Sequence, residues 1–116
     1  EIVTEIQVPA PASGTKSAYR KFAFRKAIDF PLVSAAVVCT ASGGNVSGAS
    51  IVLGGVYNLP RVATQAQTYI TGKAINDANA AGAGDAAAGG VTVLAQNNYK
   101  VQLTKVMVRR AILACK

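Results

Sequence analysis

Five basic side chains crowd into residues 16–26, and no acidic residue stands among them. They are Lys16, Arg20, Lys21, Arg25 and Lys26. Like charges at this density repel one another unless solvent or a bound anion compensates them. Tyr19 and Phe22 lie between the cations and could stack on a planar ring. The segment therefore predicts either an anion-binding surface with aromatic contacts or a solvated edge strand whose charges prevent aggregation.

Asp29 is the only acidic residue between positions 6 and 76. We expect its carboxylate to pair with Arg25 or Lys26, which precede it by four and three positions. A second basic pair, Arg109 and Arg110, falls near the end of the last expected helix. Cations at a helix C-terminus complement the helix dipole, so an anion site is only one of two interpretations there.

The segment Leu53-Gly54-Gly55-Val56 does not match a phosphate-binding loop, because neither GxGxxG nor GxxxxGK[ST] occurs in the chain. Paired glycines favour a turn, a bulge or a close backbone approach. The chain has no His and only five acidic residues. These counts argue against His-based triads, His-ligated zinc and paired-carboxylate hydrolysis. We therefore expect no catalytic residue and no metal site.

The cysteines, Cys39 and Cys115, have no metal-ligand spacing. We expect two small buried hydrophobic side chains, with a disulfide as the alternative. The net charge of +7 first indicates an anionic partner such as nucleic acid, an acidic protein or phosphate.

A chain of 116 residues is long enough for one domain with one core. Residues 2–8 alternate apolar and polar side chains, which predicts a half-buried strand. The proline-containing residues 9–14 predict a linker or a crossover. Apolar runs at 33–41 and 47–56 flank a Gly-rich connection and predict an antiparallel pair.

Helical patterns follow Pro60. Residues 64–71 predict a short helix, with Gly72 placed to end it. The Ala-rich segment 74–90 predicts one frayed helix, and its glycines favour a split near residues 82–84. A last helix is expected over residues 98–114.

Asn97 or Asn98 is expected to cap that last helix. One apolar stripe on it contains Tyr99, Leu103, Val106, Met107 and Leu113, and Arg110 projects into this stripe. A second stripe on the opposite side contains Val101, Val108 and Ile112. A helix that is apolar on two sides must be covered on two sides, and one cover could be a partner.

Short motifs follow one another in a fixed order along most of the chain. They read Glu5-Ile6-Gln7-Val8-Pro9, Tyr19-Arg20-Lys21-Phe22, Arg25-Lys26-Ala27-Ile28-Asp29-Phe30-Pro31-Leu32-Val33, Leu53-Gly54-Gly55-Val56, Pro60-Arg61-Val62-Ala63, Thr71-Gly72-Lys73 and Val108-Arg109-Arg110-Ala111. Together they resemble the C-terminal domain of the FAD-binding medium subunit of the molybdenum hydroxylases, the family of xanthine dehydrogenase and carbon monoxide dehydrogenase. The chain departs from the family pattern at residues 65–67, where acids are usual, and in the Ala- and Gly-rich stretch 74–96.

The resemblance implies an α+β fold, in which a three-stranded antiparallel sheet is covered on one face by about three helices, as in the CO dehydrogenase flavoprotein C-terminal domain. It implies a single domain over residues 1–116, with residues 1–14 as a lead-in strand and linker. This domain would be the C-terminal segment of a longer flavoprotein subunit. FAD would be bound mainly by N-terminal domains, because the phosphate-binding loop is absent from this sequence.

The resemblance also implies roles for single residues. Tyr19 would pack against the flavin ring, and Arg20 or Lys21 would bond a flavin carbonyl or stabilise the reduced ring. Asp29 would lie close by and orient Arg25. The partners implied are an iron–sulfur small subunit and a large subunit that holds the molybdenum cofactor. The domain would support electron transfer between FAD and iron–sulfur clusters without being an active oxidoreductase alone.

Two other functions remain open. One is a basic nucleic-acid-binding domain that uses residues 16–26 with Arg109 and Arg110, although aromatic residues make up only 6% and no recognition motif is present. The other is a purely structural interaction module. No signal-peptide pattern and no apolar run of about 18 residues occur, so we expect a cytoplasmic location and no membrane span.

Overall fold

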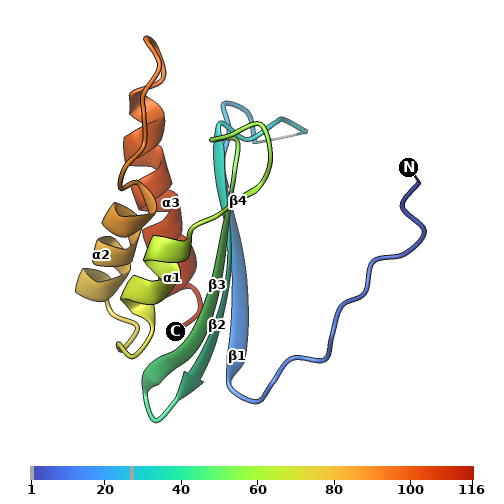
Figure 1. Cartoon of the computed structure of the whole chain (residues 1–116), viewed down its shortest axis with the longest axis vertical. Helices are drawn as coiled ribbons and strands as arrows, with labels where there is room; N and C mark the ends of the chain where they lie inside the picture. The colour runs from blue at the N-terminus through green and yellow to red at the C-terminus, as the bar shows by residue number, and fades with distance from the viewer. Residues whose placement is uncertain (1, 27) are drawn as a thin grey trace.

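The computed structural model describes residues 2–26 and 28–116, which form an antiparallel sheet with helices on one side (Figure 1). The strands are β1 (Thr15–Phe22), β2 (Val33–Ser42), β3 (Asn45–Gly54) and β4 (Arg61–Val62), in the order β1-β2-β3-β4. The helices are α1 (Thr64–Ile70), α2 (Asp77–Ala87) and α3 (Tyr99–Leu113). The expected α+β fold with one covered sheet face is confirmed, and the two-residue β4 adds a short fourth strand.

The β2–β3 hairpin is the centre of the sheet and confirms the expected antiparallel pair. Val37 lies opposite Ile51, and the connection turns through Gly43 and Gly44. Both glycines have positive φ, at 60° and 84°, as a two-residue turn of type I′ requires. The glycines therefore set the register that directs alternate side chains of both strands to the helices.

The core lies between the sheet and helices α1 and α3. Its sheet side consists of Val33, Ala35, Val37, Cys39, Ile51 and Leu53, which are all buried. Its helix side consists of Ala66, Ile70, Met107, Val108, Ala111 and Ile112. Helix α2 packs on α1 and α3, so it forms the outer edge of the helical layer (Figure 1).

The expected split of the Ala-rich helix is wrong, because α2 runs unbroken through its glycines. Gly82 lies against the ring of Tyr69 from α1, and a Cβ at Gly84 would lie 2.5 Å from the carbonyl oxygen of Lys105 in α3. The glycines thus permit two close helix contacts. Their packing role outweighs their local cost of about 1 kcal/mol each.

The expected end of α1 is confirmed, but the cap of α3 is not. Gly72 follows α1 with φ at +83°. Asn98 occupies the N-cap position of α3 without a side-chain hydrogen bond. Asn97 instead accepts a hydrogen bond from the backbone N–H of Leu94, at 2.8 Å, and so stabilises the preceding turn.

The two-sided cover of α3 comes from within the chain. The stripe that contains Val108 and Ile112 is buried together with Met107, while Tyr99 is exposed. The sheet and α2 both pack on α3. Arg110 is exposed, and Leu103, Val106 and Leu113 of the first stripe are half-buried against the core.

The expected strand at residues 2–8 is wrong in this structure. Residues 2–14 form an irregular lead that extends away from the sheet (Figure 1). Ile2, Val3, Ile6 and Val8 are each more than 80% exposed. A strand needs a neighbouring strand to accept its backbone hydrogen bonds, and within residues 2–26 and 28–116 no strand pairs with residues 2–8.

Both cysteines are free and buried, as expected. Burial, reinforced by the neighbouring Cys115, raises the pKa of Cys39 to about 12. Burial also raises the pKa of Cys115. In the part of the chain that the structure describes, no helix combines the length and apolar character needed to cross a membrane.

Candidate functional site

The register of β1 separates the predicted site residues between two faces of the sheet. Tyr19 lies opposite Ala36 and Lys21 lies opposite Ser34, on the face that carries no helix. Arg20 lies opposite the buried Ala35 and therefore belongs to the helix-bearing face. The structure thus brings Tyr19 and Lys21 to one surface and directs Arg20 to the other.

The sheet face that carries no helix, which we call the open face, has small apolar side chains at its centre. Ala36 and Val38 from β2 are exposed, and Val52 from β3 is half-buried. These residues line a shallow hollow with Ser17, Tyr19 and Ser50. The Tyr19 side chain is 55% exposed, so its ring is available beside this hollow to a planar ligand or a neighbouring domain.

The connection between β1 and β2, which we call the 23–31 loop, is described by the structure at residues 23–26 and 28–31 and lies at one end of the open face. A hydrogen bond from the Leu32 N–H to the Phe22 carbonyl, at 2.8 Å, closes it. The Arg25 guanidinium pairs with the Asp29 carboxylate at 3.3 Å, and the Arg25 N–H donates to the same carboxylate at 3.1 Å. Lys21 Nζ donates to the Asp29 carbonyl at 2.9 Å. The expected Asp29–Arg25 pair is confirmed.

The electrostatics of this loop keep Asp29 ionised. Hydrogen bonds from the Arg25 side chain and backbone lower the pKa of the Asp29 carboxyl below its ordinary value, and the Lys21 charge adds a smaller effect. Asp29 therefore fixes the position of Arg25 and, through its carbonyl, that of Lys21. Three of the predicted site residues form one connected group.

Large apolar side chains cluster at the same end of the sheet. Phe24, Ile28 and Phe30 protrude from the loop, and Tyr57 and Leu59 protrude from the β3–β4 connection. Figure 1 shows both connections at this end of the sheet. Exposed apolar side chains at one end of a sheet make this region a candidate interaction surface.

Sequence reasoning missed Tyr57 and Leu59, although the adjacent Gly54-Gly55 pair carried the relevant signal. Gly55 has φ at +76°, and a Cβ there would lie 2.8 Å from the Leu32 carbonyl oxygen. This close approach brings the β3–β4 connection against the base of the 23–31 loop. The glycine pair is therefore a backbone contact, in agreement with the sequence argument against a phosphate loop.

The remaining basic groups are dispersed. The Arg109 guanidinium binds the Asp77 carboxylate of α2, with Nη2 2.6 Å from Oδ1. Lys105 pairs with Asp85 at 3.1 Å, and Lys16 Nζ donates to the Lys116 carbonyl at 2.6 Å. Across residues 2–26 and 28–116 no group of three or more His, Cys, Asp or Glu side chains could hold a metal ion.

The sequence of the chain matches a known protein family. The family model described as "CO dehydrogenase flavoprotein C-terminal domain" matches residues 17–115. The chain belongs to this family. The match includes every strand and helix of the chain except the first two residues of β1.

Two dehydrogenase medium chains are similar to this chain in sequence. The carbon monoxide dehydrogenase medium chain of Afipia carboxidovorans is 37% identical over 97% of this chain and 40% of its own length. The glyceraldehyde dehydrogenase medium chain of Sulfolobus acidocaldarius is 34% identical over 66% of this chain and 27% of its own length. The chain thus spans at most about two fifths of these relatives.

Solved structures share the fold. Carbon monoxide dehydrogenase from Hydrogenophaga pseudoflava matches 93% of this chain and 39% of the solved chain, with a TM-score of 0.83 and 33% identity. Quinoline 2-oxidoreductase from Pseudomonas putida 86 matches 93% of this chain and 38% of the solved chain, with a TM-score of 0.79 and 29% identity. The same domain therefore occurs in oxidoreductases that differ in substrate.

Proposed function

We propose that this chain is the flavin-covering and subunit-docking domain of the FAD subunit of a molybdenum hydroxylase. The observation that carries the proposal is the open face, on which Tyr19, Lys21 and the Arg25–Asp29 pair adjoin exposed apolar side chains. The family match and the partial coverage of the medium chains support it. FAD would accept and pass on electrons, and this domain would shape the environment of its ring.

The residues present fit the flavin ring and not the rest of the cofactor. Tyr19 offers an exposed aromatic face, and Lys21 offers positive charge on the same face of the sheet. The sequence contains no phosphate-binding pattern. The pyrophosphate of FAD would therefore be held by the N-terminal portion that the longer relatives possess, and this chain alone would retain little or no flavin.

Each residue has a distinct role in this proposal. Tyr19 packs against the ring and excludes water from it. Lys21, which shares the open face with Tyr19, supplies the positive charge that favours a reduced, electron-rich ring, whereas Arg20 lies on the other face. Asp29 holds Arg25 and Lys21 in place through the hydrogen bonds described above.

The partners follow from the same proposal. An iron–sulfur small subunit would exchange electrons with the flavin, and a large subunit with the molybdenum cofactor would carry out the substrate reaction, in the cytoplasm. The exposed apolar side chains of the 23–31 loop and of Tyr57 and Leu59 supply contact area for a neighbouring domain or subunit.

Flavin retention tests this proposal. In the full-length subunit, Tyr19→Ala should weaken FAD binding about 5- to 100-fold, the range expected for loss of one stacking contact. Ser50→Ala, on the same face without an aromatic ring, serves as the matched control. Titration of the apoprotein followed by flavin fluorescence measures both. Equal affinities for Tyr19→Ala and the unmodified subunit would leave only the purely structural role.

The nucleic-acid alternative loses support from the structure. The cations of residues 16–26 are divided between two faces of β1, and Arg109 is neutralised by Asp77. A continuous basic surface, which phosphate recognition requires, is therefore interrupted. Binding to generic duplex DNA with a steep salt dependence would reverse this conclusion.

A further inference from the structure

Residues 2–8, which we call the lead segment, have the composition of a strand but no strand partner. Five of the seven residues are β-branched, namely Ile2, Val3, Thr4, Ile6 and Val8, and this residue type favours extended backbone. The backbone N–H groups of the segment donate no hydrogen bond within residues 2–26 and 28–116. The segment therefore leaves a row of hydrogen-bonding groups free for another strand.

The polar side chains of the lead segment already lie as they would in a strand. Gln7 Nε2 donates a hydrogen bond to Glu5 Oε1, at 2.6 Å, so these two side chains lie on one side of the backbone. With the alternation of an extended chain, Ile2, Ile6 and Val8 fall on the other side, and each is more than 80% exposed. The segment thus has a polar side and an apolar side, and no other described residue covers the apolar side.

The chain that follows the lead segment is fixed to the sheet. Pro9 cannot donate a ladder hydrogen bond and therefore ends the segment. The Gly14 carbonyl accepts a hydrogen bond from the Ala41 N–H of β2, at 3.0 Å, and this bond anchors the chain just before β1. Only the spacer of residues 9–13 separates the lead segment from the folded part, so a partner must lie close to β1.

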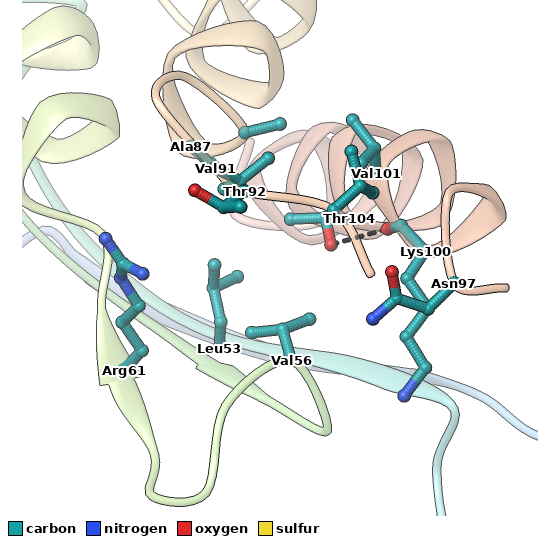
Figure 2. A pocket seen from close by; sticks show the side chains of 12 residues that line it. Leu53, Val56, Arg61, Ala87, Val91, Thr92, Asn97, Lys100, Val101 and Thr104 are labelled. Atoms are coloured by element: carbon teal, nitrogen blue, oxygen red, sulfur yellow. Dashed lines mark hydrogen bonds between the residues drawn. The ribbon is translucent and has the colours of Figure 1, made fainter. Parts of the chain in front are cut away.

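The described part of this chain offers no place for the lead segment. The outer edge of β1 pairs with no other strand of residues 2–26 and 28–116, but the lead segment turns away from this edge (Figure 1). A hollow lies between β3 and the helices, where Leu53 and Val56 face Val101 (Figure 2). Its volume of about 70 Å³ is too small for a segment of this length.

The lead segment lies outside the matched domain but within the similarity to a longer relative. The family match begins at residue 17. The similarity to the Afipia carboxidovorans medium chain extends over 97% of this chain and so includes most of residues 2–8. A segment that is shared with a longer relative and precedes the domain is expected to belong to a neighbouring structural unit.

We propose that the lead segment adds as a strand to a β-sheet in the part of the full-length subunit that lies outside this chain. This inference rests on the proposed function, because that part is the flavin-binding portion of the subunit. Backbone hydrogen bonds to the edge of that sheet provide the affinity, and Ile2, Ile6 and Val8 enter its apolar core. Glu5 and Gln7 face solvent. The pairing holds the flavin-binding portion next to this domain.

Hydrogen exchange followed by mass spectrometry in the full-length subunit tests the proposal. The paired amides of residues 2–8 should exchange at least about 100-fold more slowly than those of Ala10, Ala12 and Ser13 in the spacer. Exchange of residues 2–8 as fast as that of the spacer would overturn the proposal. Protection that disappears on dilution would also overturn it, because the partner would then be a second copy of the chain.

Ile6→Ser and Gln7→Ser form a matched pair, because the two positions are adjacent and their side chains lie on opposite sides of the segment. Ile6→Ser should lower the thermal midpoint of the full-length subunit by at least about 4 °C, because it removes an apolar side chain from a core. Gln7→Ser should change the midpoint by no more than about 2 °C. Equal midpoints for the two variants would contradict the pairing.

The flavin titration of Tyr19→Ala separates a failure of this inference from a failure of the proposed function. Rapid exchange of residues 2–8 together with weakened flavin binding by Tyr19→Ala would overturn the strand pairing alone. Slow exchange of residues 2–8 together with unchanged flavin affinity would support the pairing and remove the flavin contact.

Discussion

At the scale of single residues, the division of β1 between two faces decides which cations can act together. Tyr19 and Lys21 are two positions apart and share the open face, whereas Arg20 between them faces the helices. The Arg25–Asp29 pair was predictable because the two residues are four positions apart and no other acidic residue lies near Arg25 in the sequence. The choice between Arg20 and Lys21 was not predictable from motifs, since it depends on strand register.

Cys39 gives a prediction at this scale. The ordinary pKa of a cysteine is 9.0 and that of Cys39 is about 12, so the buried neutral thiol stabilises the fold fully below pH 9.0. This contribution is lost as the pH rises towards 12. Denaturant unfolding at stepwise pH should show the unmodified chain losing stability faster than Cys39→Ala above pH 9.0.

Thiol labelling supplies the companion measurement. At neutral pH neither cysteine should react with an aromatic disulfide reagent while the chain is folded, because both thiols are buried and protonated. Both should react in denaturant. Rapid labelling of the native chain would contradict the buried positions.

At the scale of elements, close packing between helices explains why α2 is continuous where helix propensity alone predicted a break. Sequence reasoning treated the glycines of α2 as helix breakers, because it counted their conformational cost and could not see α1 and α3 against them. The β2–β3 pair and α1 were predictable because their apolar patterns and flanking glycines agree. The strand expected at residues 2–8 was wrong because an alternating pattern does not show whether a neighbouring strand is present to pair with it.

Gly84 provides the test of this packing argument. Gly84→Ala should destabilise the chain by about 1–2 kcal/mol, because the overpacking cost against the Lys105 carbonyl exceeds the gain in helix propensity. Gly48→Ala is the control, since no atom lies within 4 Å of a Cβ there. Urea unfolding measures both. A more stable Gly84→Ala variant would show that α2 and α3 are less tightly packed than described.

At the scale of the whole molecule, one face of the sheet carries no helix and the chain spans about two fifths of its relatives. Antiparallel sheets tolerate one solvated face, but the centre of this one is apolar. This combination is typical of a domain that contacts the rest of a larger subunit. Under the proposed function this contact is made by other parts of the longer subunit, which no pattern within the 116 residues identifies.

Val38, which is 40% exposed on the open face, tests that contact. Val38→Glu should change the stability of this chain alone by no more than about 0.5 kcal/mol, as for a surface substitution. In the full-length subunit it should reduce flavin content or assembly with partner subunits, because a charge would enter an interface. Gel filtration monitored at flavin wavelengths measures both the assembly with partner subunits and the flavin content. Normal assembly and flavin content would place the interface elsewhere.

The flavin midpoint potential in the full-length subunit tests the central claim most directly. Lys21→Gln removes a positive charge from the open face, whereas Lys16→Gln removes one from the helix-bearing face. If the open face covers the flavin, Lys21→Gln should lower the potential, because the reduced ring loses a stabilising charge, and Lys16→Gln should leave it unchanged. Identical potentials for Lys21→Gln and the unmodified subunit would contradict the account.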